Sequence, residues 1–138
     1  MKVTVDLSEF HFSPEQISET IEKGLDYSSE YVKDVLIQNT PKGKGVAVNS
    51  WSIQDNGEYT REVSNSKYYL PFVNDGTGIY GKYHRPIVPV RSNVLVFEWH
   101  GKTWFLRSVK GQKPTKFVER SLESTRGKIE GLMIKAAN

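Results

Sequence analysis

The stretch "NVLVFEWHGKTWFLRSV" (Asn93 to Val109) carries the strongest strand signal in the chain, because large apolar side chains lie on both sides of a short turn sequence. A two-residue turn at His100-Gly101 makes this stretch a β-hairpin. The turn sets these cross-strand pairs: Phe97 with Trp104 and Leu95 with Leu106 on one face, Val96 with Phe105 on the other. Since both faces carry large apolar groups, the sequence predicts a hairpin that is covered on both sides.

A second hairpin is predicted upstream. The stretches "VAVNSWSIQ" (46–54) and "EYTREV" (58–63) flank Asp55-Asn56-Gly57, a turn sequence in which Gly57 takes a positive φ. The expected cross-strand pairs are Ile53 with Tyr59 and Trp51 with Arg61. Because side chains alternate along a strand, Trp51 and Ile53 then share one face.

Two helices and a short strand complete the pattern. "KVTVDL" (2–7) alternates apolar and polar residues, as a strand does, and "SPEQ" (13–16) is typical of a helix start. Thr40-Pro41 ends that helix after about 26 residues. Its apolar residues form one stripe: Ile17, Ile21, Leu25, Tyr31, Val32, Val35 and Leu36. A last helix is expected from about Thr115 to Ala136, where Gly127 and Gly131 weaken it.

Strands and helices are segregated along the chain, which predicts an α+β fold. We expect an antiparallel β-sheet of two hairpins, packed against a long N-terminal helix and a C-terminal helix. The length of 138 residues suits a single domain over residues 1–138.

Composition narrows the functional classes. The chain has 19 Lys and Arg against 16 Asp and Glu, a net charge of +3, which is too mild for a dedicated nucleic-acid binder. It has no cysteine, which excludes disulfides, thiol nucleophiles and cysteine metal sites. We expect no signal peptide, no membrane span, and synthesis in the cytoplasm.

The stretch "NDGTGIYGKYHRP" (74–86) holds two apparent phosphate-binding motifs, G-x-G-x-x-G and an incomplete Walker A loop. Tyr83 stands where the Walker motif requires Ser or Thr. Both motifs must also open a helix, and Pro86 and Pro89 prevent a helix there. The sequence therefore favours a loop whose glycines adopt positive φ over a nucleotide site, and no cofactor is expected.

No catalytic or metal-binding pattern stands out either. The histidines are His11, His84 and His100; His100 and Glu98 share a strand face but have no third ligand at motif spacing. No serine lies in a nucleophile elbow. We expect no enzymatic activity; a small hydrolase using His84 or His100 is the alternative from that class.

Two basic loops suggest a different alternative. Lys42 and Lys44 lie in "PKGKG" (41–45), and Lys110 and Lys113 lie in "KGQKPTK" (110–116). Flexible lysines among glycines suit electrostatic contact with a phosphate backbone. A small module that binds nucleic acid without sequence specificity is therefore the second hypothesis for function.

The order of motifs resembles that of the tail-completion or neck proteins of long-tailed bacteriophages, minor tail components found between head and tail tube. "PKGKGVAVNSW" (41–51) is similar to the family's loop and Ser-Trp strand. "YYLPFVNDGTG" (68–78) is similar to its Gly-Thr segment, with Asn74-Asp75 where the family often has glutamate. The stretch from Val88 to Leu122 is similar to its hairpin and its entry into the last helix. This resemblance runs from about Lys33 to the C-terminus.

The resemblance implies a structural protein without bond chemistry. It implies a homo-oligomeric ring, commonly sixfold, that joins the head connector or head-closure protein to the tail tube or tail terminator, in the neck of a phage or prophage virion assembled in the bacterial cytoplasm. Contacts that repeat head to tail and close give such a ring. The candidate contacts with DNA passing through the lumen are Lys42, Lys44, Lys110 and Lys113.

Within this assembly, the glycine loop becomes a candidate contact arm for a neighbouring subunit, because an apolar loop is costly to expose. Its residues are Gly76, Thr77, Gly78, Ile79, Tyr80 and Tyr83. An aromatic anchor is expected to hold the base of the arm in the core, and comprises Trp51, Tyr68, Tyr69 and Phe72.

Overall fold

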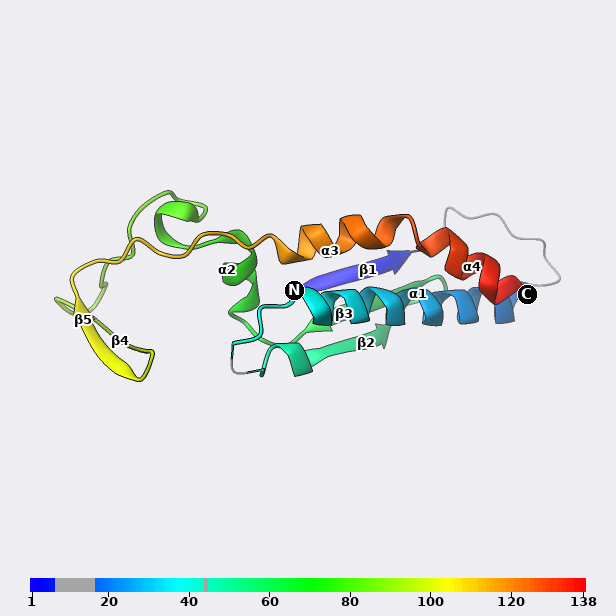
Figure 1. Cartoon of the computed structure of the whole chain (residues 1–138), viewed down its shortest axis with the longest axis horizontal. Coiled ribbons are helices and arrows are strands. Elements are labelled where there is room, and N and C mark those ends of the chain that lie inside the picture. Colours follow the sequence, from blue (N-terminus) through cyan, green and yellow to red (C-terminus); the bar gives the residue numbers. More distant parts are fainter. Residues whose placement is uncertain (7–16, 44) are drawn as a thin grey trace. The chain divides into compact units, whose positions relative to one another are not determined.

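The computed structural model describes residues 1–6, 17–43 and 45–138, which form two compact units (Figure 1). The first unit consists of Met1–Leu70 and Phe117–Asn138, and the second unit of Pro71–Lys116. The fold is α+β with antiparallel sheets, as predicted. The two hairpins lie in separate sheets, however, so the prediction of one sheet built from both is wrong. Whether the two units make a single domain stays a prediction.

The first unit contains a three-stranded sheet in the order β1-β3-β2, with β1 (Lys2–Asp6), β2 (Trp51–Asp55) and β3 (Thr60–Asn65). The hairpin register differs from the predicted one. Ile53 pairs with Val63 and Trp51 pairs with Asn65. The reason is a longer turn, in which Asn56 and Thr60 are joined by a backbone hydrogen bond of 3.4 Å. Gly57 has the predicted positive φ, at 135°.

This sheet has one apolar and one polar face. Val3 and Val5 of β1, Val63 of β3 and Trp51 of β2 are buried, and the register places them on the same face. The opposite face carries Lys2, Thr4, Asp6, Ser52, Gln54, Thr60, Glu62 and Ser64. Strict alternation therefore gives the sheet a single face to cover.

Helix α1 (Ile17–Asn39) covers the apolar face and contacts all three strands. It ends before Thr40-Pro41, as predicted, and the Thr40 hydroxyl donates a hydrogen bond of 2.5 Å to the Leu36 carbonyl. Its described part has 23 residues and is not unusually long. The predicted helix start at 13–16 lies outside the described residues.

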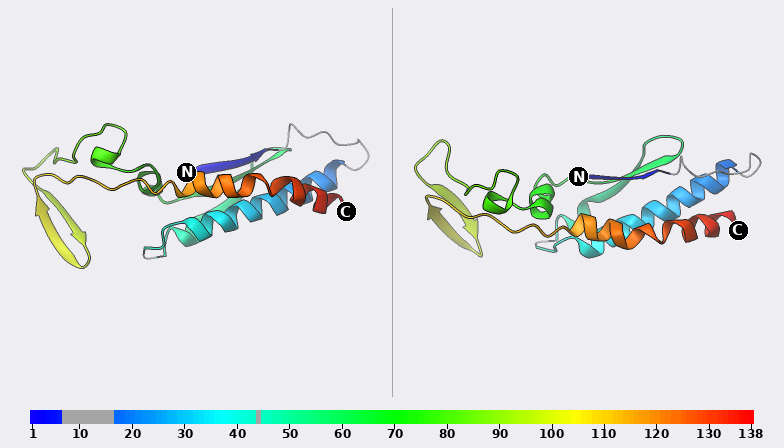
Figure 2. Two further views of the ribbon diagram at one scale, coloured as in Figure 1. Left: turned by 45° about the horizontal axis from the view of Figure 1, so that its top comes forward. Right: turned by 90° about the horizontal axis from the view of Figure 1, so that it is seen from above.

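The expected last helix is divided into α3 (Phe117–Arg126) and α4 (Ile129–Ala137), with the break at Gly127, where glycine is the poorest helix former besides proline. Both helices pack along α1, as Figure 2 shows. Gly24 permits the close approach of α4, because a Cβ there would lie 2.2 Å from the Met133 sulfur.

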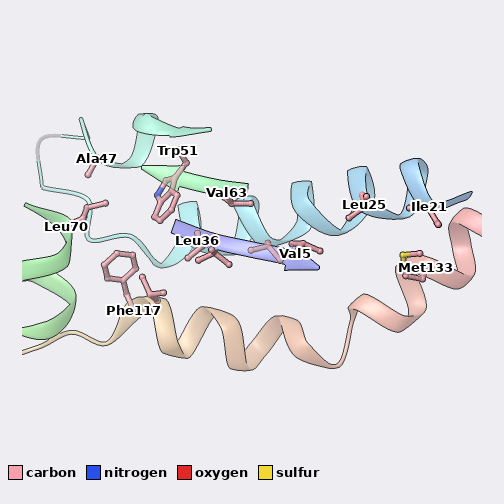
Figure 3. Close-up of a cluster of buried hydrophobic side chains, with 13 residues drawn as sticks. Val5, Ile21, Leu25, Leu36, Ala47, Trp51, Val63, Leu70, Phe117 and Met133 are labelled. Atoms are coloured by element: carbon pink, nitrogen blue, oxygen red, sulfur yellow. The ribbon is translucent and has the colours of Figure 1, made fainter. Parts of the chain in front are cut away.

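The core of the first unit lies between the sheet and these helices (Figure 3). Leu25, Leu36, Val63 and Phe117 have no exposed surface. The loop between α1 and β2 is fixed to this core by buried hydrogen bonds. The indole Nε1 of Trp51 donates to the Thr40 hydroxyl at 2.9 Å.

The second unit is built from short elements. Helix α2 (Leu70–Asp75) leads into it, followed by a 3-10 turn, η3 (Gly78–Tyr80), and a two-stranded antiparallel sheet of β4 (Leu95–Trp99) and β5 (Lys102–Leu106). The predicted pairs are all present. His100 and Gly101 have φ of 53° and 72°, the positive values that a two-residue hairpin turn requires.

Candidate interaction surface

The glycine loop pairs with a later segment of the second unit. The backbone N–H of Thr77 donates to the Gln112 carbonyl at 2.9 Å, and that of Ile79 donates to the Lys110 carbonyl at 2.8 Å. A Cβ on Gly78 would lie 2.0 Å from the Lys110 carbonyl oxygen. Glycine is therefore needed at position 78 for more than loop flexibility, because a side chain there would keep the two backbone segments apart.

The predicted contact-arm residues differ in exposure. Ile79 and Tyr80 are half-buried, and Tyr83 is 74% exposed. No helix follows the glycines in the described residues 81–94, as Pro86 and Pro89 predicted. The role of Gly76, Thr77, Gly78, Ile79, Tyr80 and Tyr83 as a subunit contact stays a prediction.

An open groove of about 600 Å³ runs beside this loop, within the second unit. Its lining includes the apolar residues Phe72, Tyr83, Pro86 and Ile87 and the glycines of the loop. Phe72 is 56% exposed and Ile87 is 38% exposed. Large apolar side chains thus line a surface that the chain itself leaves open.

The hairpin β4–β5 exposes apolar side chains on both faces. Trp99 is exposed on one face, and Val96 and Phe105 are exposed on the other, at 58% and 66%. A second groove, of about 450 Å³, is lined by Phe97, Trp99, Trp104, Leu106, Val109, Thr77, Gly111 and Gln112. The prediction that the hairpin is covered on both sides is therefore wrong for the described part of a single chain.

The second unit has no hydrophobic core of its own. Among the described residues, every buried hydrophobic side chain belongs to the first unit. The buried positions of the second unit are Asn74, Gly76 and Gly81. Several large apolar side chains left exposed together are typical of an interaction site.

The residues of the predicted aromatic anchor differ in burial. Trp51 is buried, whereas Tyr68 is 84% exposed and Phe72 is 56% exposed. Tyr69, at 36%, is also exposed, and Leu70 is the residue that enters the core. The expectation of a core position is wrong for these three aromatics, because the turn before α2 directs Leu70 inward and leaves its neighbours at the surface.

Charge is divided unequally between the units. The second unit has eight Lys and Arg against two Asp and Glu, a net charge of +6, and the first unit has eleven against fourteen, a net charge of −3. The candidate DNA contacts Lys42, Lys110 and Lys113 are exposed, and Lys44 lies outside the described residues. The Lys113 ammonium lies 5.9 Å from the Tyr80 ring centre.

The basic character of the second unit extends beyond the predicted lysines. Lys102 and Arg107, beside the hairpin, are exposed and were not among the candidates. The net charge of residues 71–116 taken alone would have pointed to Lys102 and Arg107. The modest net charge of the whole chain does not, because it sums a positive second unit and a negative first unit.

The described residues contain no group of three or more His, Cys, Asp or Glu side chains placed to hold a metal ion. Among the helices in the described part of the chain, none is long and apolar enough to cross a membrane. His84 and His100 are both exposed, and His84 Nδ1 lies 3.3 Å from the Ile79 carbonyl.

Comparison with known proteins gave one finding. Residues 8–76, half of the chain, match the HK97-gp10-like family model, described as "Bacteriophage HK97-gp10, putative tail-component". No match was found among curated proteins or solved structures. The matched range includes α1 and the hairpin β2–β3, so it begins earlier in the chain than the motifs that suggested the resemblance and ends at the glycine loop.

Proposed function

The chain belongs to the HK97-gp10-like family of bacteriophage tail components, and on that premise we propose that it is a structural virion protein that forms a ring at the head–tail junction. In this role it joins the head connector or head-closure protein to the tail tube or tail terminator. The mechanism is oligomerisation and docking and involves no bond chemistry.

The observation that carries the proposal is the uncovered apolar surface of the second unit. Val96, Trp99 and Phe105 are more than half exposed, and no described side chain of that unit provides a core for them. Burial of apolar surface is the main favourable term in protein association, so this surface is stabilised when a partner covers it. A subunit of a ring meets such a partner on each side.

Tail assembly provides the test. A phage lacking this gene should produce heads and tails that do not join, and the gene supplied in trans should restore joined particles. Electron microscopy of the purified protein, alone and with its neighbouring tail proteins, should show rings. Normal virions without the protein, or a permanent monomer that never joins tails, would contradict the proposal.

The nucleic-acid alternative also draws support from one observation, the +6 charge of the second unit. Electrostatic binding to DNA predicts an affinity that falls steeply with salt, by a logarithmic slope of about −0.9 per phosphate contacted on double-stranded DNA. Neutralising Lys42, Lys44, Lys110 and Lys113 together should then weaken DNA binding. If assembly and DNA passage are unchanged by that variant, these lysines are not lumen contacts.

A further inference from the structure

The basic, apolar surface of the second unit has a complementary surface on the same chain. Five carboxylates follow one face of α1 at spacings of three or four residues: Glu19, Glu22, Asp26, Glu30 and Asp34. Residues at this spacing are neighbours on a helix surface, and all five are exposed. The first unit thus presents an acidic stripe along most of its longest helix.

Two lysines lie on the same face of α1: Lys23, four residues after Glu19, and Lys33, three residues after Glu30, so five carboxylates against two lysines leave the face acidic. The Arg61 guanidinium lies 3.6 Å from Asp26, and it is shared with Asp55, to which it is closer at 2.8 Å. Like charges at helical spacing repel one another, by a few tenths of a kcal/mol per pair on an isolated helix. A positively charged surface placed against the stripe would remove that repulsion.

The second unit offers such a surface together with apolar side chains. Lys102 and Arg107 are exposed at the hairpin, where Lys102 Nζ lies 5.1 Å from the Trp104 ring centre. The phosphate backbone of double-stranded DNA would pair with these cations but would leave the apolar side chains of both hairpin faces uncovered. Tyr27, which is 39% exposed and follows Asp26 in α1, adds apolar surface beside the stripe.

We infer that the second unit of one copy docks on the acidic face of α1 of another copy. This inference rests on the proposed function, because it names the contact by which the ring subunits associate. The two patches are different, so the contact is heterologous and can repeat around a closed ring. Charge complementarity selects the register of the contact, and burial of the hairpin supplies the larger share of its stability.

Charge reversal on each side tests the inference. One variant carries Glu22→Lys and Glu30→Lys, and the other carries Lys102→Glu and Arg107→Glu; these positions are exposed, and lysine and glutamate have similar helix propensities. Each variant alone should dissociate the oligomer, with more than a ~10-fold rise in the dissociation constant measured by sedimentation. A mixture of the two, or a variant with all four changes, should associate again.

A matched control reverses two exposed carboxylates away from the stripe, Glu58→Lys with Glu123→Lys, and should leave association unchanged. Circular dichroism confirms that each variant is folded. Recovery in the mixture cannot arise from DNA or a third protein, because neither carries the reversed charges.

The outcomes separate this inference from the proposed function. Rings that persist in the Glu22→Lys, Glu30→Lys variant overturn the inference, while restored head–tail joining by the wild-type gene keeps the proposed function. Dissociation by the second-unit variant alone, without recovery in the mixture, means that the basic hairpin contacts a different surface of the neighbouring copy, and it also overturns the inference.

Discussion

The three-stranded sheet of the first unit and the hairpin β4–β5 of the second unit are both antiparallel, yet they distribute apolar side chains differently. In the sheet, Val3, Val5 and Val63 lie on one face, which α1 contacts, and the other face is polar. In the hairpin, Trp99 and Phe105 lie on opposite faces and both remain exposed. An apolar face that alternation confines to one side can be buried by the chain itself. The second unit is apolar on two sides, and the chain leaves both of them exposed.

The largest expected contrast between the units is in hydrogen exchange. Backbone amides of β3 and the middle of α1 should exchange only with global unfolding, which typically requires about 5–15 kcal/mol. Amides of β4 and β5 should exchange through local opening at far lower free energy, because no core holds the hairpin. Exchange measured by mass spectrometry on the monomer checks this, and equal protection in both units would remove the distinction.

A pair of phenylalanine truncations sharpens the same contrast. Phe117 has no exposed surface and lies in the core, so Phe117→Ala should lower the free energy of unfolding by about 3–5 kcal/mol. Phe105 is 66% exposed, so Phe105→Ala should change that free energy by less than about 0.5 kcal/mol. Urea denaturation measures both, and Phe105→Ala should instead weaken oligomers. Comparable destabilisation by the two would show that the hairpin contributes to the core.

Substitution of two threonines, one in each unit, should show the same contrast in unfolding free energy with a smaller difference. Thr40→Val removes the acceptor of the buried Trp51 Nε1–H and should cost about 1–3 kcal/mol, whereas Thr40→Ser keeps it and should cost less. Thr77 accepts an exposed hydrogen bond from the Gln112 N–H, so Thr77→Val should change the unfolding free energy by less than about 0.5 kcal/mol. Thermal denaturation of the three variants measures the order, and a larger loss for Thr77→Val would reverse the comparison.

The smallest effect on global stability is expected from two glycines of the second unit. Gly78 and Gly101 both have positive φ, but an added Cβ meets the Lys110 backbone only at Gly78. Gly78→Ala should abolish protection of the Ile79 amide, and Gly101→Ala should leave it largely intact; neither should move the unfolding midpoint of the first unit. A shifted midpoint for Gly78→Ala would mean that the two units unfold together.

Local patterns predicted many elements of this molecule. The hairpin 95–106 was predicted with its correct register because a two-residue turn leaves one choice of pairing. The register of β2 and β3 was wrong because the Asn-Gly signal sits inside a longer turn. The division into two sheets could not be predicted, since nothing local in a strand specifies which other strands it joins.

The candidate surface was harder to predict than the fold. Sequence reasoning identified the glycine loop and the apolar hairpin but expected burial for Tyr68, Tyr69 and Phe72, because hydrophobicity does not distinguish a core from an interface. The acidic stripe on α1 was missed, although its spacing of three and four residues is visible in the sequence. The prediction for that helix used only the spacing of its apolar residues and not the spacing of its charged residues.

The junction between the units has a mechanical consequence. The second unit is connected to the first through Leu70 and Phe117, which are both almost fully buried in the same core. Next to these residues, the two connecting segments are joined by backbone hydrogen bonds: Thr115 N–H donates to the Val73 carbonyl at 3.1 Å, and Lys116 N–H donates to the Asn74 carbonyl at 3.0 Å. A pull on the second unit is therefore borne by two covalent connections rather than one. Each connection would have to extract a large side chain from the core before the first unit yields. In the proposed ring, a subunit built in this way would transmit load between its neighbours while its fold stays intact.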